Sequence, residues 1–261
     1  MNSPLVWIAA FALALSIVAC SGPPSNPESA ARKMLRAYGG PTKVARLNSF
    51  SGKGFIKDWS SETVARSYAF DIYRKGPMYK HKIMAAPSGM LTDVIVVYFD
   101  GTAGYAWKSG KGKTSIPAEE LGFLKYRFPS VIQWVQGTPG TGEVLPSTKG
   151  EDSIRVRYRD GDIAVTLTLD GKSWLLSGVE VKSAQDSSAA FVESYSHYTE
   201  VDGIPFPQKF KAQYLGNRYY EYVLVRIDLE ADLPDSLLRV NAADSAGIER
   251  PKLEKQQPSK R

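Results

Sequence analysis

The sequence is poor in the side chains that most enzymes use for covalent or metal chemistry. It contains one cysteine, Cys20, and two histidines among 261 residues. A single cysteine excludes a disulfide within the chain, so thiol chemistry does not hold the fold together. His81 and His197 lie in separate predicted strands without a second metal-type ligand at helical spacing. A metal site needs several converging ligands, so we interpret both as ordinary strand residues and expect neither a metal nor a cofactor.

Motifs for catalysis are missing as well. No serine lies in a Gly-x-Ser-x-Gly elbow. Gly112-Lys113-Thr114 resembles the end of a phosphate-binding loop, but Trp107 occupies the position of its first glycine. The adjacent acids Glu119 and Glu120 are typical of the charged first turn of a helix. We therefore predict that the protein is not an enzyme.

A strong charge of one sign is also absent. The net charge is +6, from 33 basic and 27 acidic residues, and both signs are interspersed along the chain. This balance indicates a soluble domain with some attraction to an anionic lipid surface. It does not indicate a surface that binds nucleic acid, and we expect no nucleic-acid partner.

One long apolar run is present, over residues 5–19, and it is typical of a signal peptide rather than a membrane span. It ends in Ile17-Val18-Ala19-Cys20, which resembles the bacterial lipobox. The resemblance implies that residues 1–19 are removed and that Cys20 becomes the acylated first residue, with residues 20–26 as a flexible leash. Because residues 1–4 contain no Lys or Arg, the alternatives are a misplaced start codon and an uncleaved anchor.

The apolar pattern predicts one helix followed by a long antiparallel sheet. Asn26, Pro27 and Gly39-Gly40 are start and stop signals for a helix over residues 27–38. From Ser49 onward the period is two, which predicts a meander of about ten or eleven strands. Together with the first helix, the meander forms one predicted β domain over residues 27–240. The dry faces include Ile163 and Leu169 on one strand and Val223, Val225, Ile227 and Leu229 on another. Asp-Gly pairs at 100–101, 160–161, 170–171 and 202–203, and Gly216-Asn217, predict tight hairpins. Residues 241–261 are polar and aperiodic, which predicts disorder.

A helical segment interrupts the meander over residues 117–136. Leu121, Leu124 and Phe128 recur at helical spacing, and Pro129 begins a second short helix that carries Ile132 and Val135. The glycine-rich connector over residues 137–142 offers a hinge, so we interpret the segment as a lid.

Several motifs in this order resemble those of the LolA/LolB-like outer-membrane lipoprotein-sorting family, over nearly the whole mature chain. They are Tyr38-Gly39-Gly40, residues 47–54, Tyr98-Phe99-Asp100-Gly101 with Tyr105-Ala106-Trp107, Leu169-Asp170-Gly171-Lys172, and residues 198–207. The resemblance implies a mainly β fold with a few helices, an antiparallel half-open β-barrel with a helical lid that carries acyl chains. It does not assign the family's cavity arginine to a single position here.

The resemblance implies an outer-membrane lipoprotein, anchored through Cys20 and facing the periplasm, that binds or transfers a lipid, a lipoprotein acyl chain or another hydrophobic ligand. Ser21 after the cysteine is similar to the default outer-membrane sorting signal. The alternative is a stress sensor or assembly factor that binds an envelope protein. The residues predicted to form the cavity and lid are Tyr68, Phe70, Ile72, Leu121, Leu124, Phe128, Ile132, Ile154, Val156, Tyr158, Val165 and Leu167. Met90 and Leu91 are predicted to contact the membrane, as a protruding leucine does in the lipidated acceptors of the family.

Replacing Cys20 with Ala tests the anchor. We expect the variant to lose its acyl chains and to remain as precursor or as an alternatively cleaved soluble form, because no other residue provides the thiol. Mass spectrometry of the mature N-terminus measures this directly. A wild-type N-terminus upstream of Cys20 without acylation would refute the lipoprotein assignment.

Overall fold

The computed structural model describes residues 24, 26–59, 66–85, 94–108, 112–116, 121–137, 142–146, 152–183, 189–214, 218–229 and 232–239. Several predictions fall outside these residues. They concern the signal segment with Cys20, Met90 and Leu91, the start of the lid at 117–120, most of the connector at 138–141, the Gly216-Asn217 turn and the tail at 241–261.

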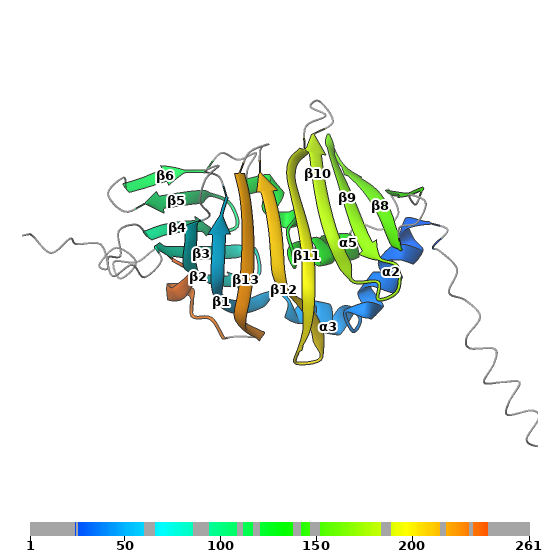
Figure 1. Cartoon of the computed structure of the whole chain (residues 1–261), viewed down its shortest axis with the longest axis horizontal. Coiled ribbons are helices and arrows are strands. Elements are labelled where there is room, and N and C mark those ends of the chain that lie inside the picture. The colour runs from blue at the N-terminus through cyan, green and yellow to red at the C-terminus, as the bar shows by residue number, and fades with distance from the viewer. Residues whose placement is uncertain are drawn as a thin grey trace, which may run out of the picture.

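Among the described residues, thirteen strands form one antiparallel sheet in the order β6-β5-β4-β3-β2-β1-β13-β12-β11-β10-β9-β8-β7 (Figure 1). The first meander comprises β1 (Ser49–Asp58), β2 (Arg66–Lys75), β3 (Met78–Ala85), β4 (Val94–Phe99), β5 (Gly104–Lys108) and β6 (Gly112–Ser115). The second comprises β7 (Gly142–Leu145), β8 (Ser153–Asp160), β9 (Ile163–Asp170), β10 (Leu176–Ser183), β11 (Ala189–Val201), β12 (Ile204–Tyr214) and β13 (Arg218–Leu229). The two meanders meet where β1 pairs with β13.

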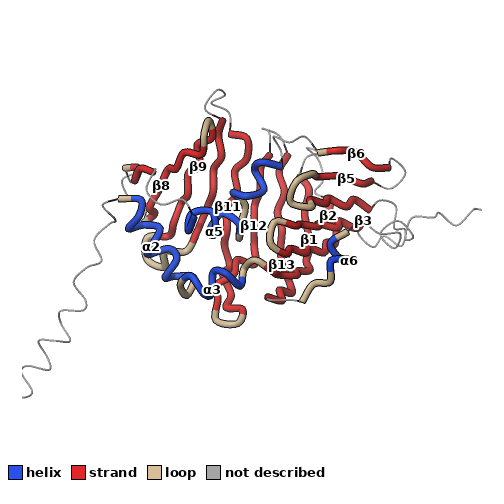
Figure 2. Tube along the Cα trace, turned by 180° about the vertical axis from the view of Figure 1, so that it is seen from behind, coloured by secondary structure: helices blue, strands red, loops and turns tan. Residues whose placement is uncertain are grey.

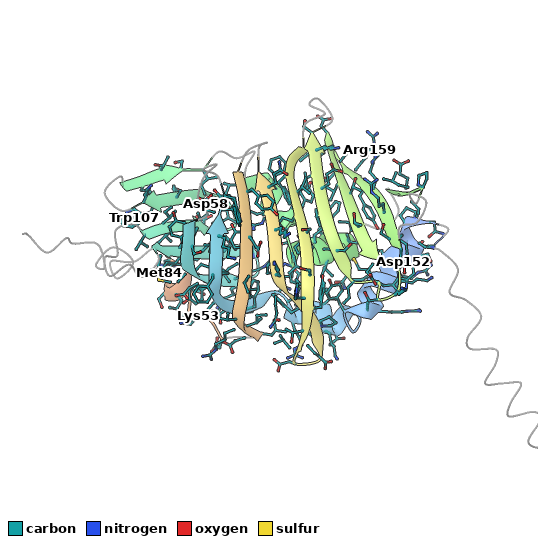
Figure 3. All side chains as sticks on the ribbon, viewed as in Figure 1. Lys53, Asp58, Met84, Trp107, Asp152 and Arg159 are labelled. Atoms are coloured by element: carbon teal, nitrogen blue, oxygen red, sulfur yellow. The ribbon has the colours of Figure 1, made fainter. Side chains whose placement is uncertain are left out.

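The sheet is curved and open, so the prediction of an antiparallel half-open β-barrel is confirmed. Figure 3 labels Trp107 on β5 and Arg159 on β8, the strands next to the two edge strands β6 and β7. The predicted number of strands was too low. The short edge strand β6 is exposed at all four residues, so it lacks the apolar alternation by which the other strands were predicted.

The helices α2 (Pro27–Ala37), α3 (Pro41–Arg46) and α5 (Ser130–Gly137) and the 3-10 helix η1 (Phe123–Tyr126) lie on the concave face of the sheet (Figure 2). Helix α6 (Asp235–Leu238) lies beside β2 and β3. None of the helices within the described ranges combines the length and the apolar character needed to cross a membrane.

The start of α2 forms as its sequence predicts. The Asn26 side chain accepts a hydrogen bond of 2.8 Å from the Ser29 amide, and Pro27 occupies the first turn. Met34 and Tyr38 are buried, and the Tyr38 hydroxyl lies 2.9 Å from that of Tyr198. These contacts fix the helix against β11.

The concave face over β8, β9 and β10 is filled by side chains. Val156, Tyr158 and Leu167 are buried there, in one cluster with Met34 of α2 and Ile132 of α5. The α5 residue Trp134 packs edge-on against Tyr158 and against Tyr126 of η1, at ring distances of 5.7 and 5.1 Å. This half of the sheet therefore has a packed hydrophobic core.

The predicted dry face of β13 was wrong for Val223 and Val225. A bulge shifts the pairing of β1 with β13, so that Lys53 pairs with Arg226 and Gly54 with Leu224. The extra residue reverses the alternation, because each single-residue step turns a side chain to the opposite face. Leu224 is consequently buried and Val225 is 62% exposed. Phe55, on the neighbouring strand β1, is 54% exposed.

Gly54 provides a test of the bulge. A Cβ at this position would overlap the Val223 carbonyl oxygen and crowd the Leu224 backbone. We expect Gly54→Ala to lower the free energy of unfolding by about 1–3 kcal/mol, measured by urea denaturation. Gly137→Ala is the matched control, because among the described residues no atom outside its own helix backbone and its chain neighbours lies within 4 Å of its Cβ position. Equal stability of the two variants would contradict the bulge geometry.

Candidate functional site

The connection between β6 and β7 crosses the concave face, because these strands are the opposite edges of the sheet. Its described part, residues 121–137, contains η1 and α5. Helix α5 packs with α2 and α3 over one half of the sheet, and the other half has no α-helix of the described residues packed on its concave face. A cavity of about 960 Å³ lies there, between β1, β2, β3, β12 and β13 on one side and η1 with the start of α5 on the other.

The wall of this cavity is mainly apolar. Phe50, Phe70 and Leu224 are buried residues of the sheet, and Leu121 and Leu124 face the cavity from the crossing segment. Phe128 fixes that segment to the sheet, because its ring contacts Phe206 at 4.9 Å. Similar ring contacts join Phe128 to Tyr195, Phe210 and Tyr38, at 5.7, 6.2 and 6.2 Å.

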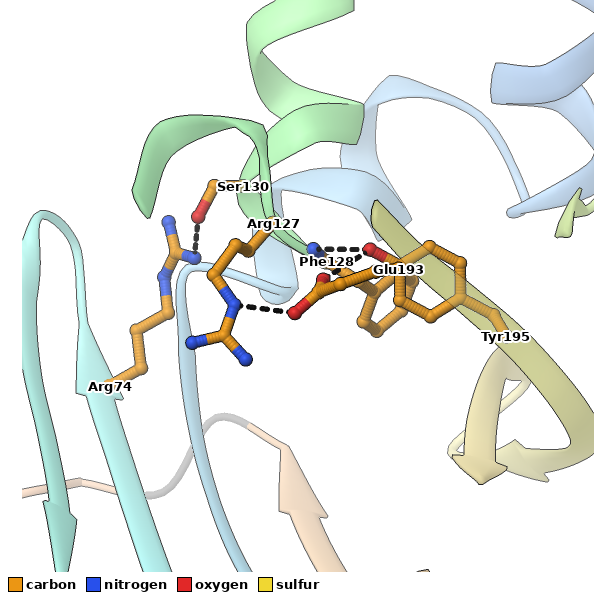
Figure 4. A network of polar contacts seen from close by, with 6 residues as sticks. All are labelled: Arg74, Arg127, Phe128, Ser130, Glu193 and Tyr195. Carbon is orange, nitrogen blue, oxygen red and sulfur yellow. Dashed lines mark hydrogen bonds and ion pairs between the residues drawn. The ribbon is translucent and has the colours of Figure 1, made fainter. Parts of the chain in front are cut away.

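A buried ion pair lies at the edge of the cavity (Figure 4). The Arg127 Nε atom, just after η1, donates a hydrogen bond of 2.7 Å to Oε1 of Glu193 on β11, which is only 2% exposed. The Tyr195 hydroxyl donates to the second carboxylate oxygen at 2.6 Å and accepts from the Phe128 amide at 3.2 Å. Burial, and then the Glu193 carboxylate, raise the pKa of Tyr195 well above its usual value, so the hydroxyl keeps its proton.

A second guanidinium group, that of Arg74, reaches the same cavity from β2. Its nitrogen atoms donate to the Gly76 carbonyl at 3.2 Å, to Oε1 of Gln133 at 3.4 Å and to the Ser130 hydroxyl. All three acceptors are neutral. Burial lowers the pKa of Arg74 to about 10, so the side chain still carries its positive charge at neutral pH.

His81 lies on strand β3, as the sequence predicted, and it also lines the cavity. The residue is 5% exposed, and its Nε2 atom has no hydrogen-bond partner among the described residues. The ring packs edge-on against Phe70 at 5.2 Å and lies 5.8 Å from the Tyr222 ring. Burial, and then the Arg127 charge, lower the pKa of His81 to about 3, so the ring is neutral.

Five predicted site residues line the cavity, namely Phe70, Ile72, Leu121, Leu124 and Phe128. The other seven lie in or against the packed core, and none of them lines the cavity; they are Tyr68, Ile132, Ile154, Val156, Tyr158, Val165 and Leu167. The helices α2 and α5 cover the faces on which most of these seven lie. A period of two identifies a dry face, but it does not tell whether a helix or a ligand covers it.

Sequence reasoning missed the polar residues of the cavity, although a signal was present. Glu193 falls between Phe191 and Tyr195 on the buried face of β11, and Arg74 follows Phe70 and Ile72 on the same face of β2. A charged side chain at a position that the alternation predicts to be buried is unusual, because a buried charge needs a partner.

Comparison with known proteins identifies the fold. No family model and no curated protein matches the sequence. A DUF1329 family protein from Desulfovibrio piger has a similar structure, with a TM-score of 0.56 and 10% identity over 84% of this chain and 99% of that one. A LolA superfamily protein from Nitrosomonas europaea has a TM-score of 0.50 and 13% identity, over 80% of this chain and 97% of that one. An outer membrane lipoprotein-sorting protein domain from Vibrio parahaemolyticus has a TM-score of 0.52 and 12% identity, over 82% of this chain and 99% of that one. The chain therefore has a LolA-like fold.

The lowered pKa of His81 predicts a pH-dependent stability. Between pH 6.5 and about 3 the unfolded chain binds a proton that the folded chain excludes, so stability falls as the pH falls. Relative to His81→Phe, wild type should lose up to about 1.4 kcal/mol of unfolding free energy per pH unit below 6.5. Urea denaturation at pH 7.5, 6 and 5 measures the difference.

The exposed His197 provides the control for this experiment. Asn suits its positive φ of 54°, and His197→Asn should keep the pH dependence of wild type. If the unfolding free energies of wild type and His81→Phe changed equally with pH, the prediction of a neutral buried ring would be wrong.

Proposed function

We propose that the protein is a membrane-anchored lipoprotein of the bacterial envelope that binds or transfers a lipid, a lipoprotein acyl chain or another hydrophobic ligand in the concave cavity. The observation that carries this proposal is the cavity of about 960 Å³ with its aromatic and aliphatic wall. Sites for small molecules have volumes of about 300–1,000 Å³ and are mostly apolar with a few polar groups. The combination of Phe70, Ile72 and Leu124 with Arg74 and His81 has this character.

The energy of burial is sufficient for such binding. Each methylene group that leaves water contributes about 0.8 kcal/mol, so ten methylenes contribute about 8 kcal/mol before ordering costs. This corresponds to a dissociation constant of about 1 μM. An apolar cavity therefore needs no sequence motif to hold an acyl chain, and we assign no chemical step to it.

The names of two structural neighbours support an envelope role. One is a LolA superfamily protein, and another is an outer membrane lipoprotein-sorting protein domain. The lipobox-like Ile17-Val18-Ala19-Cys20 adds the membrane anchor. We accordingly propose that the protein is tethered to the outer membrane through acylated Cys20, with its domain in the periplasm.

A second candidate function is the binding of an envelope protein, as a stress sensor or assembly factor does. One observation favours it. Phe55 and Val225 expose their apolar side chains on the convex face, on neighbouring strands at the bulge. A partner held there would be lost on substitution of these two residues with Ser, whereas binding in the cavity would persist.

Filling the cavity tests the principal proposal. The full chain with Cys20→Ala, which is not acylated, should bind a fluorescent fatty-acyl probe, and Leu124→Trp should weaken that binding at least about tenfold because the larger ring occupies the cavity. Leu237→Trp, on the exposed face of α6 and away from the cavity, is the matched control. Fluorescence titration measures the affinities, and thermal unfolding confirms that both variants fold.

Two outcomes would contradict the proposal. The first is that wild type does not bind the probe at all. The second is that Leu124→Trp and Leu237→Trp bind it equally well, which would place the probe outside the cavity. A stable complex with an envelope protein, without acyl binding, would support the second candidate instead.

A further inference from the structure

We propose that the hydrophobic ligand carries an anionic head group, a carboxylate or a phosphate, which Arg74 and His81 bind at the wall of the cavity. The inference rests on the proposed function and narrows it, because it names the ligand class as an anionic amphiphile. Three observations support it: the positions of the two side chains on the sheet, the charges around the cavity, and the unpaired nitrogen of His81.

The register of β2 and β3 brings the two residues together. Ile72 pairs with His81, and Arg74 pairs with Tyr79. Residues two apart on a strand share a face, so Arg74 and His81 are diagonal neighbours, about 7–8 Å apart between their Cα atoms. Both line the cavity. This distance suits two side chains that hold different oxygen atoms of one head group.

The described residues around the cavity give no negatively charged partner to one of its cations. Among the described residues, the charged side chains that line it are Arg74, Lys125, Arg127 and Glu193. Arg127 is paired with Glu193 at 2.7 Å. Lys125 is paired at 2.6 Å with Asp160, which is more exposed than Glu193. Arg74 contacts only a carbonyl, a hydroxyl and an amide oxygen within the described part of the chain.

A partly buried cation with neutral partners binds an anion favourably. Removing a charge from water is costly unless an opposite charge compensates for it. The guanidinium group matches the geometry of a carboxylate or a phosphate, and its charge-assisted hydrogen bonds are stronger than those to neutral oxygens. Arg74 thus has the chemistry to select an anionic head group over a neutral one.

His81 provides an independent sign of a ligand. Its Nε2 atom is buried, belongs to a residue that is 5% exposed, and has no hydrogen-bond partner among the described residues. A buried polar atom without a partner is rare and unfavourable. In the neutral tautomer with its proton on Nε2, this atom donates a hydrogen bond to an oxygen acceptor. A head-group oxygen at the cavity wall satisfies it.

The apolar wall continues from this polar pair. Ile72 and then Phe70 follow Arg74 on the same face of β2, at steps of about 6.8 Å. Leu224 of β13 lies in the same wall. A ligand whose head contacts Arg74 and His81 therefore extends its tail over Ile72 and Phe70, where burial of methylene groups provides affinity.

A pair of probes that differ only in the head group tests this inference. A fluorescent fatty acid and its methyl ester are titrated, below their aggregation concentrations, into the unacylated full chain (Cys20→Ala) near neutral pH. Wild type should bind the acid at least about tenfold more tightly than the ester, as expected for hydrogen bonds to a charged group. Arg74→Gln should weaken binding of the acid much more than binding of the ester, and so remove this preference.

Further variants locate the head group. Arg226→Gln is the matched control, because this arginine is 68% exposed and does not line the cavity; it should keep the preference of wild type. His81→Phe should reduce the preference about threefold, the effect of one weaker hydrogen bond. Competition with unlabelled fatty acid and with lysophosphatidic acid of equal chain length then distinguishes a carboxylate head from a phosphate head.

The possible failures are distinguishable. If neither probe binds wild type, the proposed function is wrong, and the inference fails with it. If wild type binds acid and ester equally, the proposed function stands and the anionic head group is refuted. This comparison needs no substitution, so it decides the question even if Arg74→Gln does not fold. A preference that persists in a folded Arg74→Gln variant would also overturn the assignment.

Discussion

The ion pair between Arg127 and Glu193 determines where the crossing segment lies on the sheet. A carboxylate that is 2% exposed is stable only with strong partners, and here a guanidinium group and the Tyr195 hydroxyl supply them. Arg127 comes just after η1, and Phe128 follows it into a cluster of aromatic rings. The ion pair and the adjacent Phe128 ring hold the crossing segment at one position on the sheet. The boundary of the cavity depends on that position.

The division of the concave face into a packed half and an open half follows from the connectivity. The edges β6 and β7 lie at opposite ends of the sheet, so their connection must run across the concave face. Helix α5 packs with α2 and α3, and the side chains of β8 and β9 complete that core. Over β1, β2 and β3 no helix of the described residues fills the face, and Phe70, Ile72 and His81 line open space.

The sequence predicted the elements better than it predicted what covers them. The capping residues of α2 and the alternation of β2, β8 and β9 are local signals, and the structure agrees with both. The short edge strand β6 carries too few residues for such a signal, and the bulge at Val225 shifts the pattern by a single residue. The site was predicted in part. Apolar periodicity found Phe70 and Ile72, but it treated Val156 and Leu167 as equivalent to them, because coverage by α2 and α5 is a tertiary property.

The pairing of β1 with β13 also limits the order in which the protein folds. Phe50, near the start of the domain, pairs with Leu229, near its end. Each meander can form its hairpins from neighbouring residues, but the seam between them requires nearly the whole chain. Contacts at such sequence separation form slowly, because the entropy of closing the loop must be overcome first. A chain that is synthesised from its N-terminus thus completes its sheet only after the last strand has been made. Until then β1 keeps an unpaired edge, at which chaperones can bind and aggregation can begin.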